Sequence, residues 1–577
     1  MRARFERSRI EPWMLALGAI LLLALLLRLW GIKYGLPFGY QIDEERIYVR
    51  GAARMLDAGS VNPHYMQNPP LFTYLLEAIF AARYGGGEAH RLIGEVPQRT
   101  DLFLTARIVT ALIGTAAVWL TFAAARRFFD RRVGLVAALL MAVAFLPVFY
   151  SHVALNNVPA MAAASAALIG IAGILRRGET RDYVVAGALV GVAAATKYLD
   201  GIVVVPMLTA ILLAPRGPAT PTLRRALLLA LGVAVTAFVI CNPYAVIKPA
   251  HFIGSLGIQG DVVSKHKFGQ PSEGGVEHYL RTFTWGLGWV PVIAALAGAT
   301  LLAHTDRRRA LVLIPIVPVF ILYMGLKTRY FGRWMLPVFP ILCLLAAYGA
   351  VHAADLAAAR LRRPQVAIAL TTLAAVALAA QGIVHSVHND RVLSRPHTLN
   401  LARIWMLDHV PRDARVITEP FVANAWNSPW DHAINSPRLL LGGESAYARY
   451  LSDRLVRAYM RDGYCWVVAS SNYWGLALSD PVVGKRAASY YAALARYGTV
   501  RYSASPWGDV GRPGGPGRDV VPFDYDWSYD FYPLSYQHPG PMVQVYQLHG
   551  GACPGGSGVV SPSRPRLSSN PSPRPAS

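Results

Sequence analysis

The chain has 577 residues, of which 54% are hydrophobic and only 15% are charged, with a formal net charge of +23. A soluble protein of this length carries about 25% charged residues, so the composition excludes an ordinary soluble enzyme. The arginines that supply the excess charge lie in short clusters between apolar blocks, as the positive-inside rule predicts. The charge therefore reports membrane topology, and we expect no nucleic-acid partner.

The apolar blocks are long enough to cross a hydrocarbon core of about 30 Å. The first follows a basic N-terminus without a small-residue cleavage site, so we interpret it as a retained helix. We predict eleven spans, in chain order at residues 13–30, 103–125, 133–150, 158–175, 183–197, 200–214, 225–241, 285–303, 310–325, 334–352 and 365–384. With the N-terminus in the cytoplasm, every arginine-rich short loop falls on the cytoplasmic side.

This topology places three long segments outside the cytoplasm, namely residues 31–102, residues 242–284 and everything from residue 385. The expected fold class is mainly α, a polytopic membrane protein with a small C-terminal extracytoplasmic α/β domain. In the last segment "ARVITEP", "CWVVAS", "VRYSAS" and "MVQVYQL" have the composition of strands, and "YARYLSDRLVRAYMRDG" and "KRAASYYAALARYG" that of helices ending at Gly.

The predicted domains are therefore a transmembrane domain at residues 1–384, an α/β domain at 385–553 and a disordered Pro/Ser/Gly-rich tail at 554–577. Four cysteines form no CxxC pair, so they fit no metal pattern. Cys465 and Cys553 both lie in the outer segment, where a disulfide is chemically allowed. The sequence leaves open whether they pair.

An acidic cluster follows the first span in "GLPFGYQIDEE", which contains Asp43, Glu44 and Glu45. Asp43 occupies the position of a helix N-cap, and the two glutamates fall in the first turn, where acids stabilise a helix. After "NPHYMQNPP" the apolar stripe of "LFTYLLEAIFAARY" predicts a helix lying in the membrane interface. By themselves these residues allow two roles for Asp43, a helix cap and a base.

The ordered motifs of this loop resemble the first outer loop of bacterial membrane glycosyltransferases of the C-type fold. That group is family 39 and its neighbours, with the protein O-mannosyltransferases and the lipid A aminoarabinose transferase. "GVAAATKYLDGIVVVP" and "KTRYFGRWMLPVFPIL" are similar to later segments of these proteins, and the resemblance covers about residues 13 to 350. It implies a C-type glycosyltransferase fold. It also implies transfer of a hexosyl or pentosyl unit, with inversion, from a polyprenyl-phosphate donor to an extracytoplasmic hydroxyl on a glycan, lipid or protein.

The resemblance implies that Asp43 is the general base that deprotonates the acceptor hydroxyl. It leaves Glu44 to orient Asp43 or to contact the acceptor, and we interpret Glu45 as a solvated residue of the cap turn. The leaving phosphate needs cationic donors near the bilayer surface. The candidates for donor phosphate binding are Arg329 and Arg333 first, with Lys327, Tyr330 and Lys197. Snorkelling of the basic side chains to lipid headgroups is the alternative.

The segment "YSHVALNNVPA" contains His152, Asn156 and Asn157, which are possible acceptor or supporting residues. Relatives carry an Asp in this region, and neutral amides are poorer ligands for hard cations. We therefore expect no required cofactor, a divalent metal remains possible, and no metal ligand is assigned. For His152, the alternative to a role at the acceptor is a purely structural role, as is common for a lone His in a turn.

The expected localisation is the cell membrane, multi-pass, with a cytoplasmic N-terminus and an extracytoplasmic C-terminal domain. The expected partners are a polyprenyl-phosphate sugar, membrane lipid and an extracytoplasmic acceptor. Two alternatives are a membrane transporter or flippase for lipid-linked sugars and a non-catalytic scaffold with the same fold. A transporter needs a charged path at the bilayer centre, and the predicted spans carry almost no acid or base there. The sugar, the acceptor and the oligomeric state are not assigned.

Overall fold

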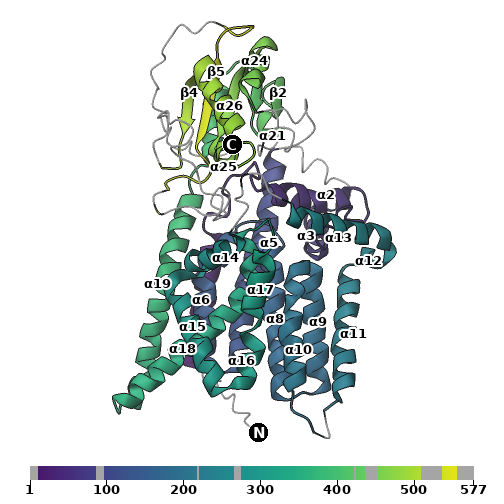
Figure 1. Ribbon diagram of the computed structural model, residues 1–577, viewed down its shortest axis with the longest axis vertical. Helices are drawn as coiled ribbons and strands as arrows, with labels where there is room; N and C mark the ends of the chain where they lie inside the picture. The colour runs from purple at the N-terminus through teal and green to yellow at the C-terminus, as the bar shows by residue number, and fades with distance from the viewer. Residues whose placement is uncertain are drawn as a thin grey trace, which may run out of the picture. The chain divides into compact units, whose positions relative to one another are not determined.

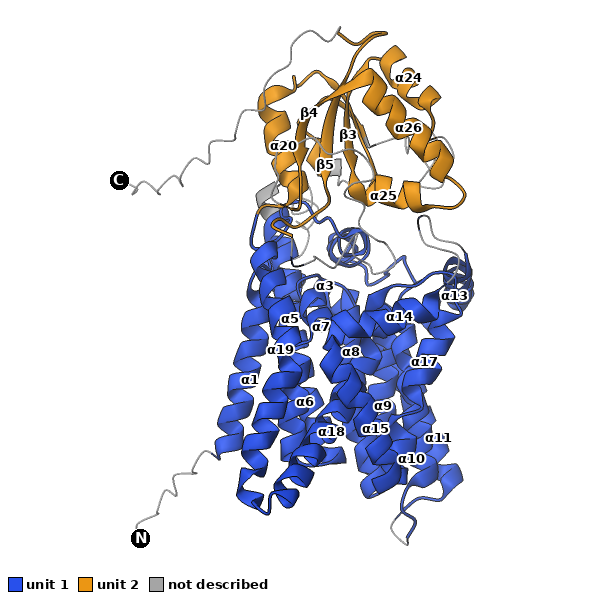
Figure 2. Ribbon diagram, turned by 60° about the vertical axis from the view of Figure 1, so that its left-hand side comes forward, with its two compact units in different colours: residues 1–395, 522–534 blue, residues 396–521, 535–577 orange. Residues whose placement is uncertain are grey.

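The computed structural model describes residues 11–85, 96–217, 220–265, 269, 274–420, 424–435, 451–507, 534 and 536–554. The chain divides into two compact units, which Figure 2 shows in two colours. Unit 1 comprises residues 1–395 with 522–534, and unit 2 comprises residues 396–521 with 535–577.

Unit 1 is a bundle of long apolar helices with shorter helices across one end of it (Figure 1). The bundle contains α1 (Pro12–Leu29), α5 (Val96–Phe128), α6 (Arg131–Val143), α7 (Phe145–Tyr150), α8 (Asn157–Arg176), α9 (Thr180–Thr196), α10 (Val204–Leu213), α11 (Leu223–Cys241), α15 (Trp289–Thr305), α16 (Arg307–Leu313), α17 (Ile316–Gly325), α18 (Phe339–Arg360) and α19 (Ala367–Leu393). The other elements of unit 1 are η1 (Glu44–Val49), α2 (Arg50–Asp57), α3 (Leu71–Tyr84), η2 (Tyr198–Val203), α12 (Tyr244–Ile247), α13 (Pro249–Ser264), α14 (Gly275–Phe283), η3 (Thr284–Gly288), η4 (Gly332–Val338) and, between α18 and α19, η5 (Pro364–Val366).

In the part of the chain that the structure describes, eight helical runs are long and apolar enough to cross a membrane. They coincide with eight of the eleven predicted spans. The span predicted at 133–150 is broken between α6 and α7, because Pro147 has no N–H to donate to the carbonyl of Val143. The other two predicted spans coincide with α9, which has 17 residues, and with the short apolar run Tyr198–Leu213.

The core of unit 1 lies along α8 and α18, whose apolar windows are 89% and 94% buried, against 11% for α11. Glycine brings neighbouring helices into close contact here, as small residues do in membrane bundles. A Cβ atom on Gly298 of α15 would lie 2.0 Å from the carbonyl oxygen of Leu345 on α18, and one on Gly191 of α9 would lie 2.2 Å from that of Ala234 on α11. These two helix pairs therefore pack backbone against backbone.

Unit 2 is an α/β domain with a five-stranded sheet in the order β2-β1-β3-β5-β4. Its elements are α20 (Thr398–His409), β1 (Arg415–Thr418), α21 (Asn424–Asn427), β2 (His432–Asn435), α24 (Asp453–Arg461), β3 (Tyr464–Ser470), α25 (Ser471–Ser479), α26 (Gly484–Tyr497), β4 (Gly498–Ala504) and β5 (Val543–Leu548). Strands β2, β1 and β3 are parallel, and β5 is antiparallel to both β3 and β4.

The small C-terminal α/β domain and its four predicted strands are confirmed by β1, β3, β4 and β5, whereas β2 was not predicted. Cys465 and Cys553 form a disulfide, with a Cα–Cα distance of 5.4 Å. The bond ties the start of β3 to the segment after β5. Residues 555–577 of the predicted disordered tail lie outside the described residues.

Candidate active site

The acidic cluster after α1 begins a helix that Gln41 caps. Gln41 Oε1 accepts hydrogen bonds from the backbone N–H groups of Asp43, at 2.7 Å, and Glu44, at 3.3 Å. The Asp43 side chain makes no capping hydrogen bond. The capping role expected for Asp43 is therefore wrong, because an amide two residues earlier already satisfies these donors. The Asp43 carboxylate is left 42% exposed.

Glu44 is fully buried and fully hydrogen-bonded. Its carboxylate accepts two hydrogen bonds from the guanidinium of Arg107, both at 2.8 Å, and a third from the backbone N–H of Ala154 at 2.8 Å. Arg107 also donates to the carbonyls of Ile32 and Tyr34. Glu44 therefore fixes the start of this helix to α5 and to the turn before α8, and these contacts favour a structural role.

Glu45, which we expected to be solvated, is 8% exposed. Its Oε1 pairs with Arg99 at 2.9 Å and with Arg50 at 3.0 Å. Arg50 is a near neighbour in the chain, but Arg99 lies in α5 and reaches Glu45 only in the folded protein, so the solvated state expected for Glu45 is wrong. Among the three acids, Asp43 thus has the solvent-accessible carboxylate.

Asp43 lies next to Arg333 at the start of η4. The Arg333 Nη2 atom is 3.7 Å from Asp43 Oδ2, and the guanidinium packs over the ring of Phe331 at 4.0 Å from its centre. The charge of Asp43 also affects the pKa of two nearby tyrosines. Burial and the Asp43 carboxylate raise the pKa of Tyr65 to about 12 and raise the pKa of Tyr48 well above its ordinary value. Both phenols therefore keep their protons near this carboxylate.

Two asparagines of the turn between α7 and α8 hydrogen-bond to the backbone at Thr196 and at Arg333. Asn156 Nδ2 donates to the carbonyl of Thr196 at 2.8 Å, and Asn157 Nδ2 donates to the carbonyl of Arg333 at 3.4 Å. Both amides are buried. They are placed to fix the backbone next to Lys197 and at Arg333, and their predicted contact with an acceptor stays a prediction.

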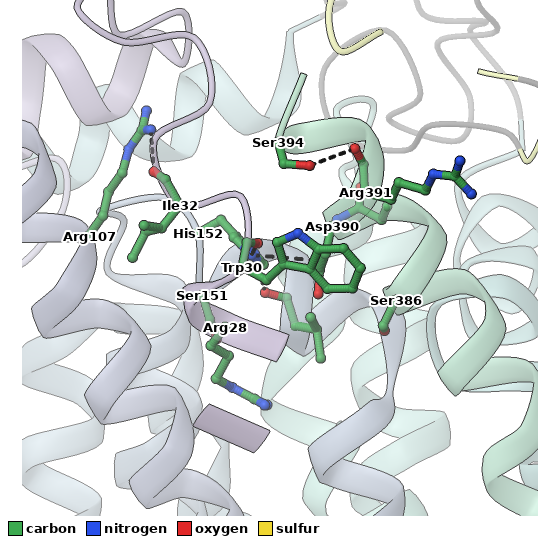
Figure 3. A network of polar contacts seen from close by, with 12 residues as sticks. Arg28, Trp30, Ile32, Arg107, Ser151, His152, Ser386, Asp390, Arg391 and Ser394 are labelled. Atoms are coloured by element: carbon green, nitrogen blue, oxygen red, sulfur yellow. Dashed lines mark hydrogen bonds and ion pairs between the residues drawn. The ribbon is translucent and has the colours of Figure 1, made fainter. Parts of the chain in front are cut away.

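His152, in the same turn, is fully buried in a polar network that Figure 3 shows. One ring nitrogen contacts the carbonyl of Val148 at 3.0 Å, and the other contacts that of Trp30 at 2.9 Å and lies 3.5 Å from Asp390 of α19. The buried Arg28 donates to carbonyls of α1 and α6 nearby. Since both nitrogens of His152 are occupied, its contacts favour the structural interpretation.

A cavity of about 230 Å³ opens beside Lys197, which is 6% exposed at the end of α9. Its lining residues are Gln67, Asn68, Lys197, Tyr198, Leu199, Leu256, Gln259, Gly260, Val263, Tyr323, Met324, Lys327 and Trp334. Asp43 and Arg333 do not line it, but Lys197 interacts electrostatically with both. Tyr198 donates to the carbonyl of Met66 at 2.9 Å, which ties the loop before α3 to this wall.

The structure thus brings together three of the predicted phosphate-binding residues and Asp43. Lys197 and Lys327 face one cavity, and Arg333 is paired with Asp43 beside it. Tyr330 is 2% exposed and packs on the ring of His278, with ring centres 4.6 Å apart. Arg329 is half-buried and is not among the cavity residues.

Sequence reasoning missed Gln41, Arg107 and Asp200 as residues of this region. Asp200 carried a signal, because an acid inside an apolar helical run is expensive and suggests a function. Arg107 carried a similar signal within the span predicted at 103–125. Among the described residues, no three His, Cys, Asp or Glu side chains are grouped so that they could hold a metal ion.

Comparison with known proteins identifies the fold. The apo structure of ArnT from Cupriavidus metallidurans superposes with a TM-score of 0.52 at 15% sequence identity, covering 92% of this chain and 97% of that one. The chain has the C-type glycosyltransferase fold. The apo oligosaccharyltransferase of Archaeoglobus fulgidus gives the same TM-score at 13% identity, covering 90% of this chain and 76% of that one.

The sequence of this glycosyltransferase-fold chain also matches a family model. Residues 100–247 match the family described as dolichyl-phosphate-mannose-protein mannosyltransferase. The ArnT of Cupriavidus metallidurans bound to undecaprenyl phosphate is similar as well, with a TM-score of 0.51 at 16% identity over 81% of this chain and 94% of that one. No curated protein sequence matches the chain. The expected C-type fold is confirmed.

Proposed function

We propose that the chain is a membrane glycosyltransferase that moves a monosaccharide from a polyprenyl-phosphate donor to an extracytoplasmic hydroxyl. The observation that carries the proposal is the half-exposed Asp43 carboxylate 3.7 Å from Arg333, beside a cavity lined by Lys197 and Lys327. A solvent-accessible carboxylate can act as a base, and cations bind a leaving phosphate. Similar solved proteins are bound to undecaprenyl phosphate and, in the archaeal AglB, to a dolichol-phosphate.

In the proposed reaction Asp43 takes the proton of the acceptor hydroxyl. The hydroxyl oxygen forms the new bond to C1 of the sugar, and the bond from C1 to the phosphate oxygen breaks with its electron pair going to the phosphate. This single displacement inverts the configuration at C1. Glu44 acts through its contacts with Arg107 and Ala154, which hold the Asp43 backbone in place.

The leaving phosphate gains negative charge as the bond breaks, so donors aimed at it lower the barrier. Arg333 is suited to this role because its planar guanidinium offers several N–H donors in a fixed geometry. Lys197 and Lys327 extend the positive charge into the cavity. In this proposal the donor phosphate draws Arg333 away from Asp43, which frees the carboxylate to act as a base.

The proposed location is a multi-pass membrane protein with a cytoplasmic N-terminus and unit 2 outside the cytoplasm. The arginine-rich short loops support this orientation. The disulfide between Cys465 and Cys553 supports it independently, because structural disulfides persist in oxidising compartments.

The test is sugar transfer by the purified full-length chain. A panel of radiolabelled polyprenyl-phosphate sugars, containing hexoses and pentoses, is incubated with envelope fractions from cells that lack the protein. We expect transfer of label from at least one donor, and we expect Asp43→Asn to lower the rate by about 10²- to 10⁴-fold, the usual contribution of a positioned base. Parallel assays with EDTA and with added Mg²⁺ or Mn²⁺ test the metal requirement.

The matched control is Asp57→Asn, because Asp57 is an exposed carboxylate at the end of α2 in the same loop. This variant should transfer sugar at the wild-type rate. If Asp43→Asn were equally active, Asp43 would not be the base. If no donor were used by either form, the glycosyltransferase proposal would fail, and donor movement across reconstituted vesicles would then separate a transporter from a scaffold.

A further inference from the structure

An apolar groove of unit 1 lies apart from the residues of the proposed reaction. Its volume is about 420 Å³, and it is formed by the end of α2 with the loop after it, by α3 and by the end of α11. The residues that line it include Leu56, Val61, Tyr74, Glu77, Ile240 and Pro243. None of its lining residues also lines the cavity beside Lys197, so the two features are separate.

The end of α11 places this groove at the surface of the membrane. Helix α11 is one of the runs that can cross a bilayer, and only 11% of its apolar window is buried, so most of its surface faces lipid. Ile240, which lines the groove one residue before α11 ends, is 72% exposed. Val246 and Ile247 of α12, which follows α11 in the chain, are exposed as well. The groove is therefore open to lipid where a spanning helix ends, which is the depth of the headgroups.

Two polar side chains of α3 interrupt the apolar lining. Tyr74 and Glu77 stand three residues apart, so they lie on the same face of the helix. The Tyr74 hydroxyl is buried and has no hydrogen-bond partner within the described chain. Burial raises the pKa of Tyr74 above its ordinary value, so the hydroxyl keeps its proton and can donate it in a hydrogen bond.

Glu77 carries the single charge among the described residues that line the groove. Its carboxylate forms no hydrogen bond or ion pair with another described residue. Burial raises the pKa of Glu77 above its ordinary value, because the surroundings disfavour the charged form. A partly desolvated carboxylate gains most from a cation that donates N–H groups to it.

The two polar groups and the apolar lining together define the ligand. It needs a cation with N–H groups for Glu77, an adjacent anionic oxygen for Tyr74 and an apolar body for Leu56, Val61 and Ile240. An ethanolamine phospholipid has all three, since a short ethylene link joins its ammonium group to its phosphate. The cation of a choline headgroup has no N–H to donate, and a glycerol headgroup has no cation.

We propose that the groove between α3 and the end of α11 binds a membrane phospholipid with a primary ammonium headgroup. The Glu77 carboxylate accepts hydrogen bonds from the ammonium group, the Tyr74 hydroxyl donates to the phosphate, and the upper part of an acyl chain packs against Ile240. The bound lipid joins the loop helix α3 to the spanning helix α11. This site does not depend on the proposed sugar transfer.

The first experiment tests for contact between Glu77 and the ammonium group. The purified full-length chain is reconstituted into vesicles that contain phosphatidylethanolamine and phosphatidylcholine. A water-soluble carbodiimide then joins a carboxylate to an amine that touches it, with loss of water, and peptide mass spectrometry locates the modified acid. Since binding holds the two groups together, we expect about tenfold or more coupling at Glu77 than at Glu277, an exposed acid of α14.

Equal coupling at Glu77 and Glu277 would show that headgroups meet any exposed acid, and it would overturn the proposal. Absence of coupling at Glu77 would overturn it as well. In Tyr74→Phe the coupling at Glu77 should persist at a lower yield, because the ammonium contact remains while the phosphate contact is lost.

The second experiment measures lipid binding by its effect on thermal unfolding in detergent. A ligand that binds the folded chain raises the unfolding temperature in a saturable way, which gives an apparent Kd. We expect this rise with phosphatidylethanolamine and not with phosphatidylcholine or phosphatidylglycerol of the same acyl chains. Glu77→Gln should weaken binding by about tenfold, the loss of one charge-assisted hydrogen bond, and Tyr74→Phe by about threefold.

The matched control is Glu277→Gln, which removes an exposed acid paired with Arg281 and should bind the lipid as wild type does. Because Glu77 has no partner within the described chain, Glu77→Gln should unfold at the wild-type temperature when no lipid is added. An undiminished response of Glu77→Gln to phosphatidylethanolamine would overturn the proposal, and so would an equal response of wild type to phosphatidylglycerol.

Discussion

Two adjacent acids, Asp43 and Glu44, have opposite environments in this protein. Glu44 is buried and accepts three hydrogen bonds, two of them from Arg107, whereas Asp43 is 42% exposed and lies 3.7 Å from Arg333. The first arrangement suits a fixed structural contact, because all its hydrogen-bonding capacity is directed at the protein. The second suits chemistry, because the carboxylate can meet a substrate.

At the residue scale, we expect Arg107→Met to destabilise unit 1 by about 3 to 5 kcal/mol, since it leaves the Glu44 carboxylate buried and unpaired. Thermal unfolding of the purified protein in detergent measures this loss. Glu44→Gln combined with Arg107→Met should recover part of it. The control is Arg83→Met, which breaks an exposed ion pair with Asp101 and should cost less than about 1 kcal/mol. Equal losses of stability in Arg107→Met and Arg83→Met would contradict the structural role of the buried contact between Glu44 and Arg107.

Helices in unit 1 approach each other most closely where glycines face a neighbouring backbone. Gly298 on α15 faces the carbonyl of Leu345 on α18, and Gly191 on α9 faces that of Ala234 on α11. In contrast, Gly232 on α11 has no atom within 4 Å of the position of a Cβ atom. Glycine thus has a packing role at some helix positions and none at others.

At the element scale, we expect Gly298→Ala to lower stability by about 1 to 3 kcal/mol, because the new Cβ atom forces α15 and α18 apart. Gly232→Ala should be neutral or stabilising by up to about 1 kcal/mol, because alanine favours the helical conformation. Thermal unfolding of both variants measures the difference. A neutral Gly298→Ala would show that the two helices can separate without cost.

At the scale of the whole molecule, the disulfide lies entirely within unit 2, and the free cysteines Cys241 and Cys343 lie in unit 1. The bond closes a loop with a sequence separation of 88 residues, which limits the conformations of the unfolded chain. The two units each have their own core, so the disulfide should stabilise one of them selectively.

We therefore expect Cys465→Ser with Cys553→Ser to destabilise unit 2 by about 2 to 5 kcal/mol and to leave unit 1 unchanged. Limited proteolysis of the full-length chain over a temperature series, with fragments assigned by mass spectrometry, reports each unit separately. Cys343→Ala in unit 1 is the control for loss of a cysteine as such. Simultaneous loss of protection in both units would show that their stabilities are coupled.

The sequence alone determined the membrane class, most of the spans, the α/β character of the C-terminal unit and the resemblance to C-type glycosyltransferases. These features depend on local sequence. The length of an apolar run decides whether it can cross the bilayer, and the hydrophobic periodicity distinguishes strands from helices. The exceptions were also local in origin. Pro147 broke a predicted span, and two further apolar segments formed shorter helices than a span requires.

Only the tertiary structure decided which acid is accessible. Arg107 of α5 covers Glu44, and Arg333 at the start of η4 lies beside Asp43, whereas the cap by Gln41 is a local contact. The two arginines are distant from the acids in the chain, and the geometry of their contacts depends on how the helices pack, so no local pattern reveals them. Lys197 was predicted from its charge within an apolar region, but only the folded chain places it with Lys327 at one cavity.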